Sequence, residues 1–259
     1  MNVEATIEHI TGWLRDYGQS AGAGGFVIGV SGGIDSAVSS TLAARTGMPL
    51  LIVEMPIHQS HDQVTRAREH IGFLKQRHET VESVEVELTG VFDRLVEALP
   101  DGTDGESREM SLVNTRARLR MTTLYYFAAL QGRLVVGTGN KVEDFGIGFF
   151  TKYGDGGVDL SPIADLVKTE VYALGRALGV NEAILTAPPT DGLWGDDRTD
   201  EDQIGASYPE LEWAMSFDGD DSALDNRQRE VLAIYRRLNA GNKHKMEPIP
   251  VCMIPDALR

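Results

Sequence analysis

The segment SGGIDS, residues 31–36, combines two glycines, two hydroxyls and one carboxylate within six positions. Glycines let backbone N–H groups approach a ligand closely, and the hydroxyls add donors, so the composition is that of an anion-binding turn. A carboxylate beside an anion such as phosphate requires a cation between them, and Mg²⁺ is bound in this way by one or two carboxylates and phosphate oxygens. Asp35 is therefore a candidate metal ligand. The alternative is a glycine turn in which Asp35 is an ordinary favourable charge in a first helical turn.

The residues around this segment place it at the edge of a sheet. Residues 26–30 form a continuous apolar run, typical of a parallel strand covered on both faces, and residues 35–45 follow as a helix. In open α/β sheets, ligands bind at the carboxyl ends of strands, where the next helix directs its free N–H groups at them. A Walker A loop is excluded because no lysine precedes Lys75, and the glycines do not fit GxGxxG.

Further strands and helices alternate along the chain. Strands are expected at 49–53, 80–88 and 134–136. Helices are expected at 3–17, 61–76, 165–178 and 223–239, and along an apolar stripe from Val113 to Ala128 that ends at Gly132. Irregular segments are expected at 101–109, after Thr138, and at 188–205. The alternation predicts an α/β fold with a doubly wound parallel sheet and helices on both faces, in a single domain over residues 1–259.

Two further segments carry groups that could do chemistry. In NTRARLR, Arg118 shares a helix face with Asn114, while Arg116 and Arg120 share another face that could simply be solvated. In GTGNKVED, which follows a strand, Glu143 offers a second carboxylate to a metal, or is a surface charge.

Cations to offset phosphate must come from outside the first loop. Lys152, Lys168 and Lys245 are the candidates. The acidic run 196–202 is expected to be a hydrated or mobile lid rather than a metal cluster. The segment NKHKMEPIP is expected to be a basic tail, with a disordered terminus as the alternative.

The overall composition limits the kinds of partner that the protein could bind. A formal charge of −15 disfavours a polyanion such as tRNA, which requires clustered Lys and Arg. Cys252 is the only cysteine, which excludes an intrachain disulfide and a multi-cysteine zinc site. The first residues lack the features of a secretory leader, and no apolar run has the length of a membrane span. A cytoplasmic enzyme with no nucleic-acid or membrane partner is expected.

SGGIDS resembles the pyrophosphate-binding loop of the N-type ATP pyrophosphatases, which cleave ATP to AMP and pyrophosphate while adenylating a substrate. The segments NTRARLRM, GTGNKVEDFGIGFFTKYGDGGVDLSP, APPTDGLW and KHK further resemble the ammonia-dependent NAD synthetases. This resemblance implies an adenine nucleotide alpha hydrolase-like fold. It also implies a ligase that adenylates nicotinic acid adenine dinucleotide with ATP and Mg²⁺ and amidates it with ammonia, giving NAD. The family forms homodimers whose nicotinate-dinucleotide sites lie at the subunit interface.

The resemblance assigns roles by position. It places ATP contacts at Gly29, Ser31, Gly32, Gly33, Asp35, Ser36, Thr138, Lys168 and Thr190. It places magnesium ligands at Asp35 and Glu143. It places contacts to nicotinic acid adenine dinucleotide at Arg118, Lys152, Asp159, His244 and Lys245. Lys168 is expected to offset charge during adenylation. Asp155 is our hypothesis for the carboxylate that binds ammonium and takes its proton, because ammonium itself is not a nucleophile.

Three alternatives stay open from the sequence. A tRNA-modifying pyrophosphatase would need a basic face, and a deazapurine-type synthase would need a zinc-binding cysteine cluster. A non-catalytic ATP-binding module would bind ATP without releasing pyrophosphate. A glutaminase domain, present in some relatives, would need a cysteine nucleophile and a few hundred further residues, so free ammonia is the expected nitrogen donor.

Overall fold

A parallel sheet forms the centre of the protein. The computed structural model describes residues 1–100, 105–190 and 199–259. Within them, β1 (Phe26–Gly29) pairs with β2 (Leu50–Glu54) on one side and β4 (Leu134–Val135) on the other, and β3 (Val81–Glu85) pairs with β2. The order is β3-β2-β1-β4. The winding direction therefore reverses between β1 and β4, and ligands of doubly wound sheets bind at that reversal.

Helices cover both faces of the sheet, because successive strand residues point to opposite sides. Phe26 and Ile28 of β1 join a core with residues of five helices. These are α1 (Val3–Ser20), α2 (Ile34–Arg45), α3 (His61–Arg77), α6 (Lys168–Ala177) and α7 (Glu182–Leu185). Val27 faces the opposite core, which includes residues of α4 (Thr89–Ala98) and α5 (Glu106–Gln131). The predicted doubly wound α/β fold is confirmed.

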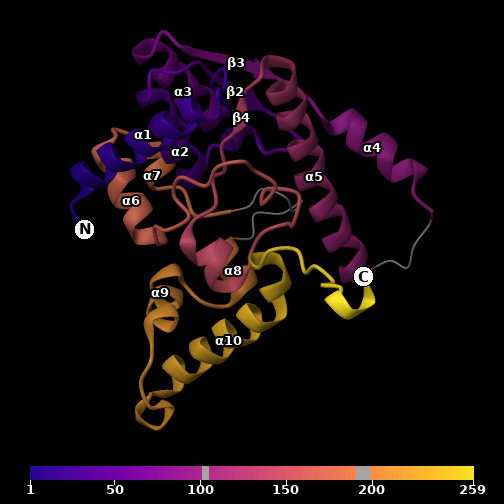
Figure 1. Cartoon of the computed structure of the whole chain (residues 1–259). Coiled ribbons are helices and arrows are strands. Elements are labelled where there is room, and N and C mark those ends of the chain that lie inside the picture. Colours follow the sequence, from indigo (N-terminus) through magenta and orange to yellow (C-terminus); the bar gives the residue numbers. More distant parts are fainter. Residues whose placement is uncertain (101–104, 191–198) are drawn as a thin grey trace.

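A third core lies beyond the carboxyl edge of the sheet, in the lower part of Figure 1. Its residues come from one π-helical turn and three α-helices. These are η1 (Val142–Ile147), α8 (Asp200–Ile204), α9 (Tyr208–Ser216) and α10 (Asn226–Met246). Short 3-10 turns occupy Asp221–Ala223 and Asp256–Leu258. Since η1 follows β4 and α10 contacts η1, this helical layer closes one side of the site.

Several sequence predictions about these elements were wrong in detail. The helix α5 begins at Glu106, so residues 106–109 are not a loop, while 101–104 lie outside the described residues. The long segment after Thr138 is not irregular throughout, because it contains η1. The helix α9 was not predicted. The basic segment with His244 and Lys245 is not a tail but the last turn of α10, which extends past 239.

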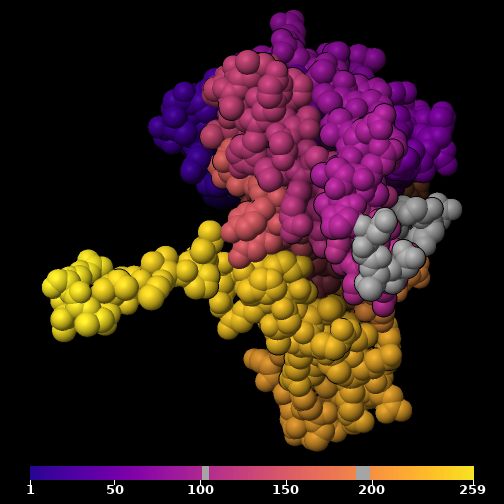
Figure 2. All heavy atoms as spheres, turned by 90° about the vertical axis from the view of Figure 1, so that its right-hand side faces the viewer, coloured from indigo at the N-terminus to yellow at the C-terminus, as the bar shows by residue number. Residues whose placement is uncertain are grey.

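The last 13 residues, 247–259, form an arm that leaves the body of the protein (Figure 2). Every residue of the arm is exposed. Its large apolar side chains are no exception, with Val251 74% and Met253 77% exposed. None of the helices in the described residues is both long and apolar enough to cross a membrane.

Candidate active site

The loop of residues 31–36 is closed by hydrogen bonds among its own members. Ser36 Oγ accepts from the N–H of Ser31 at 3.2 Å and donates to the carbonyl of Gly33 at 3.0 Å. Ser31 Oγ in turn accepts from the N–H of Gly33 at 3.3 Å. Gly33 is the N-cap of α2, so the free N–H groups of the first turn of α2 begin at this loop. The geometry is that of an anion-binding helix terminus.

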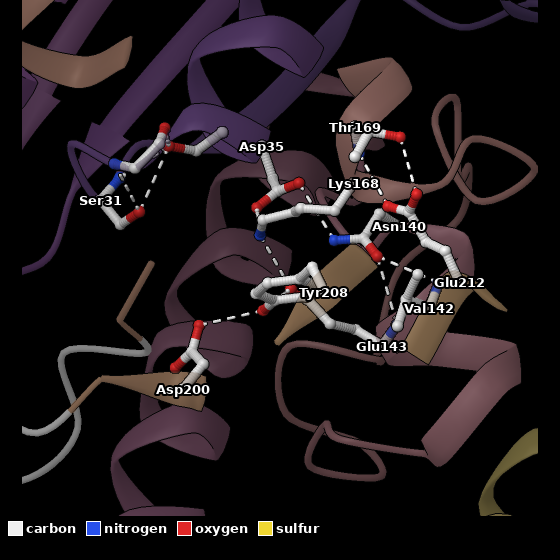
Figure 3. Close-up of polar contacts among 12 residues, drawn as sticks. Ser31, Asp35, Asn140, Val142, Glu143, Lys168, Thr169, Asp200, Tyr208 and Glu212 are labelled. Atoms are coloured by element: carbon white, nitrogen blue, oxygen red, sulfur yellow. Dashed lines mark hydrogen bonds and ion pairs between the residues drawn. The ribbon is translucent and has the colours of Figure 1, made fainter. Parts of the chain in front are cut away.

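A buried cation joins two carboxylates next to this loop (Figure 3). Lys168 Nζ lies 2.5 Å from Asp35 Oδ2 and 2.9 Å from Glu143 Oε1, and the lysine side chain is 3% exposed. Asn140 supports both carboxylate residues. Its Nδ2 donates to Asp35 Oδ1 at 3.1 Å, and its Oδ1 accepts from the backbone N–H of Glu143 at 3.2 Å. One ammonium thus serves two carboxylates, so the three groups carry a net charge of about −1.

The charges in this cluster depend on one another. Burial raises the pKa of Asp35, and Lys168 opposes that shift. Burial would also raise the pKa of Glu143, but Lys168 and the hydroxyl of Tyr208 hold it below its ordinary value. Although burial disfavours a charged lysine, the two carboxylates raise the pKa of Lys168, so the ammonium stays protonated.

The helical layer reaches the cluster through Tyr208, the first residue of α9. Its hydroxyl donates to Glu143 Oε1 at 2.6 Å and lies 3.2 Å from Asp200 Oδ2. Burial and the nearby carboxylates raise the pKa of Tyr208, so its hydroxyl remains a donor. Asp200 is 5% exposed. The prediction that residues 196–202 form a hydrated run is therefore wrong at Asp200, and residues 191–198 of the predicted lid lie outside the described residues.

One cavity collects all the residues predicted to bind ATP, Mg²⁺ and ammonium. It lies between the loops that follow β1 and β4. The predicted residues that line it are Gly29, Ser31, Gly32, Gly33, Asp35, Ser36, Thr138, Glu143, Asp155, Lys168 and Thr190. These residues span 162 positions of sequence, from 29 to 190, and only the parallel topology brings them together.

Two further carboxylates face this cavity. Asp155 accepts from the N–H of Thr151 at 2.9 Å. Although the side chain is exposed to the cavity, the surrounding protein atoms desolvate it and raise the pKa of Asp155 to about 6. Burial, with Glu143 next in effect, raises the pKa of Asp144 to about 8. Asp144 was not singled out in the sequence.

The predicted dinucleotide contacts do not line the cavity. Arg118 donates to the carbonyl of Lys152 at 3.4 Å, and Lys152 Nζ donates to the carbonyl of His244 at 2.6 Å, so these three form a separate group. Lys245 Nζ contacts the carbonyls of Gly148 and Phe150 instead.

Asp159 lies beside the edge strand of the sheet. Its Oδ1 accepts from the hydroxyl of Tyr125 at 3.0 Å, and its Oδ2 accepts from the N–H of Val135 at 2.8 Å. The residue therefore fixes α5 against β4.

The two other arginines of NTRARLR are not a solvated face. The guanidinium carbon of Arg116 lies 4.4 Å from the centre of the Phe92 ring. Arg120 donates to the carbonyl of Met55 at 3.1 Å and to Gln59 Oε1 at 2.7 Å. Arg120, Met55 and Gln59 also line the cavity. The shared face of Asn114 and Arg118, in contrast, is confirmed, because both contact residues 151–152.

Sequence reasoning missed several residues of this site. Asn140 belongs to the segment GTGNKVED, and its position just after a strand could have indicated a site residue. Tyr208 follows a strand-free stretch, but Ser207 and Glu210 form a capping box with Pro209 between them, a recognisable start signal for a helix. No sequence signal indicates that the Tyr208 hydroxyl reaches Glu143.

The Asp35 and Glu143 carboxylates fit a magnesium site. Both converge on the same cation, the Lys168 ammonium, so their oxygens already share one electrostatic centre. The described residues contain no cluster of three or more acidic, histidine or cysteine side chains arranged to hold a metal. Phosphate oxygens would therefore supply the remaining ligands, as is usual for Mg²⁺ bound with a nucleotide.

The parallel sheet, the glycine-hydroxyl loop at the switch between β1 and β4, and the paired carboxylates define an α/β nucleotide-binding enzyme of the adenine nucleotide alpha hydrolase-like fold. The chain belongs to the NAD synthase family, whose sequence profile matches residues 6–248. The resemblance seen in the sequence and the expectation of a ligase are thereby confirmed.

Known proteins are similar to this one over nearly the whole chain. The NH(3)-dependent NAD(+) synthetase of Carboxydothermus hydrogenoformans is 38% identical over 246 residues, which cover 95% of this chain and 96% of that protein. The structure of an NMN synthetase from Francisella tularensis superposes with a TM-score of 0.85 at 31% identity and covers 99% of both chains. An NH3-dependent NAD synthetase from Campylobacter jejuni gives a TM-score of 0.79 at 26% identity, covering 98% of this chain and 100% of that one.

Proposed function

We propose that the protein adenylates nicotinic acid adenine dinucleotide with ATP and then amidates it with ammonia, giving NAD, AMP and pyrophosphate. The observation that carries this proposal is the convergence of Asp35, Glu143 and Lys168 beside the loop of residues 31–36. That arrangement combines an anion-binding helix terminus with a cation site, which is what cleavage between the α- and β-phosphates requires.

In the first step, two anions must meet, the nicotinate carboxylate and the α-phosphate of ATP. Chain groups therefore act mainly by positioning and charge neutralisation. The N–H groups and hydroxyls of residues 31–36 would hold the departing pyrophosphate, and Lys168 would offset developing charge. Asp35 and Glu143 would hold Mg²⁺, which when bound adds positive charge against the phosphate oxygens.

In the second step, ammonia attacks the activated carbonyl. Asp155 supports this step because its carboxylate faces the cavity and its pKa of about 6 leaves it ionised at neutral pH. An ionised carboxylate binds ammonium and accepts its proton, which frees the nucleophile.

A mononucleotide acceptor is the second candidate. It is favoured by the match to the NMN synthetase from Francisella tularensis over 99% of both chains. The corresponding substrate would be nicotinic acid mononucleotide, with the same two chemical steps. The nicotinate carboxylate would be the reacting group in both acceptors, so the chemistry around Lys168 would be the same.

We also propose a homodimer. The Arg118, Lys152 and His244 group lies outside the cavity of its own chain, so it would serve dinucleotide binding from a neighbouring subunit. Exposed apolar side chains on α5, Tyr126 at 62% and Leu130 at 66%, and those of the arm offer surface for such a contact. Sedimentation of the full chain tests this, and a strictly monomeric protein would contradict it. A cytoplasmic location, expected from the sequence, is part of the same proposal.

Pyrophosphate release from purified protein with Mg-ATP tests the function. Each nicotinate acceptor should be supplied with ammonium or with glutamine, and the products followed by mass. The expected result is AMP and an amidated product with ammonium and not with glutamine. ATP binding without pyrophosphate would indicate a non-catalytic module. Comparison of the two acceptors decides between the dinucleotide and the mononucleotide.

A further inference from the structure

Helix α9 contacts the site cluster through two residues one turn apart (Figure 3). The Tyr208 hydroxyl donates to Glu143 Oε1 at 2.6 Å. Four residues later, the Glu212 carboxylate accepts from the N–H of Thr169 at 2.9 Å and from its hydroxyl at 2.7 Å. Thr169 directly follows Lys168 in the sequence. One face of α9 therefore contacts both Glu143 and the residue next to the lysine that binds Glu143.

Glu143 receives two donors on the same oxygen. Both Lys168 Nζ and the Tyr208 hydroxyl bind Oε1. A satisfied buried network of this kind is rigid, so two donors hold the carboxylate in place more firmly than one. The Tyr208 hydroxyl is therefore placed to set which way the Glu143 carboxylate faces.

Packing alone does not account for this hydroxyl. Tyr208 is 2% exposed and belongs to the helical core, where phenylalanine would fill similar space without a polar atom to satisfy. Its ring also lies beneath the lysine, with Lys168 Nζ 4.6 Å from the ring centre. The hydroxyl and the ring thus contact the two oppositely charged members of the same cluster.

We propose that Tyr208 is a positioning residue of the reaction, whose hydroxyl holds the Glu143 carboxylate in the orientation that accepts the metal of the bound nucleotide. This inference rests on the proposed function. Tyr208 does not line the cavity, so it acts through Glu143.

Tyr208→Phe tests the proposal, because it removes the hydroxyl and keeps the ring. The direct readout is Mn²⁺ binding in the presence of a non-hydrolysable ATP analogue, followed by the spectroscopic signal of free Mn²⁺. The dissociation constant should rise about tenfold, the size expected for one hydrogen bond to a charged group. In turnover, the Mg²⁺ concentration for half-maximal rate should rise in parallel, and saturating Mg²⁺ should recover most of kcat.

Tyr235→Phe is the matched control. Tyr235 packs against the same helical core from α10 and does not line the cavity, so this variant should bind Mn²⁺ like the wild type. On a Glu143→Gln background, Tyr208→Phe should change Mn²⁺ affinity less than about twofold, since its partner is already altered. Replacing Tyr208 by 4-aminophenylalanine, which puts an N–H donor where the hydroxyl was, should recover part of the affinity and provides the test if Tyr208→Phe does not fold.

Equal Mn²⁺ affinity in Tyr208→Phe and Tyr235→Phe would overturn the positioning role. So would an equal loss in the wild-type and Glu143→Gln backgrounds, because the effect would then not pass through Glu143. If the wild type itself releases no pyrophosphate, the proposed function fails instead. The two failures are therefore distinguishable in one set of proteins.

Discussion

Lys168 Nζ lies 2.5 Å from Asp35 Oδ2, although 133 positions separate the two residues in sequence. Each residue stands in the first turn of a helix, Asp35 in α2 and Lys168 in α6, and the two helices contact each other. A lysine at a helix N-terminus is unfavourable for the helix dipole. Its position there is explained by the two carboxylates that it bridges.

Replacing Lys168 should therefore cost both stability and activity. In Lys168→Met, Asp35 and Glu143 lose the ammonium that joins them, and breaking a buried ion pair by removing one partner costs about 3–5 kcal/mol. Pyrophosphate release should fall at least about 100-fold, as expected when a preorganised charge is lost from a site. Urea unfolding and a pyrophosphate assay measure the two effects. Lys168→Arg, which keeps the charge, should lose less stability, and equal stability of Lys168→Met and wild type would contradict this account.

Amide formation, the second step, should depend on Asp155, whereas adenylation, the first step, should not. Asp155→Asn removes the carboxylate but keeps its size, so adenylation should proceed while the ammonia-dependent step slows at least about 100-fold, within the range of acid–base catalysis. Single-turnover measurement of the adenylate and of the amide separates the steps. An Asp155→Asn enzyme with a full rate of amide formation would remove Asp155 from this role.

The same carboxyl predicts a pH dependence. Its pKa is raised to about 6, mainly by desolvation, with Glu143 raising it and Lys245 lowering it. The ionised form binds ammonium, so the amide-forming rate should fall as the pH drops through about 6. The concentration of free ammonia also falls as the pH falls, in every variant. The measurement is therefore the ratio of the amide-forming rates of wild type and Asp155→Asn between pH 8 and pH 5. A ratio independent of pH would be inconsistent with this assignment.

The first loop should tolerate alanine at one glycine and not at its neighbour. Gly32 has φ +81°, and a Cβ there would lie 2.5 Å from the carbonyl oxygen of Gln63 and 3.1 Å from the backbone nitrogen of Ala67. The left-handed conformation alone costs a non-glycine residue about 1–2 kcal/mol, and the backbone clash adds to it. Gly33 has an extended backbone, and its Cβ would meet only Ser31 Oγ at 3.4 Å. Urea unfolding should show a loss in Gly32→Ala of about 2 kcal/mol or more, and near wild-type stability in Gly33→Ala.

Acid should destabilise the protein through His70. This histidine of α3 is 1% exposed, its Nε2 lies 2.9 Å from Ser40 Oγ, and burial lowers its pKa to about 4. Because the folded pKa lies below the unfolded value, its contribution to stability is complete above pH 6.5 and is lost as the pH falls from 6.5 towards 4. The loss between pH 7 and pH 5 should be about 2 kcal/mol. His70→Gln should show a smaller fall over that interval, whereas His61→Gln, at an exposed position, should behave as the wild type.

The order of strands and helices was predictable because it depends on local patterns. Buried parallel strands are continuous apolar runs, and β1, β2 and β4 fall within a residue or two of the predicted ranges. The amphipathic stripe of α5 predicted its end at Gly132, which adopts the left-handed conformation of a helix cap. The start of α5 was misjudged because its first turn, ESRE, is as polar as a loop.

The candidate site was only partly predictable, because its completing contacts join distant segments. The roles of Asp35 and Glu143 were expected from the resemblance, but their shared cation is a tertiary feature. Tyr208 lies 65 positions from Glu143 in the sequence, and no local pattern predicts the hydrogen bond between them. The segment NKHKMEPIP was expected to be a basic tail, yet basic residues are also typical of the last turn of a helix, as in α10.

The π-helical turn that carries Glu143 and Asp144 has a consequence for how this site tolerates change in chain length. A π-helix accommodates one more residue per turn than an α-helix, so η1 is in effect an α-helical turn with one residue inserted. Removing a single residue between Val142 and Ile147 would restore the α-helical period. The side chains before the deletion would then be rotated by about 100° relative to those after it. Glu143 would then turn away from Lys168 while the composition of the segment barely changed. At this position, the length of the chain matters to the proposed metal ligand as much as its identity does.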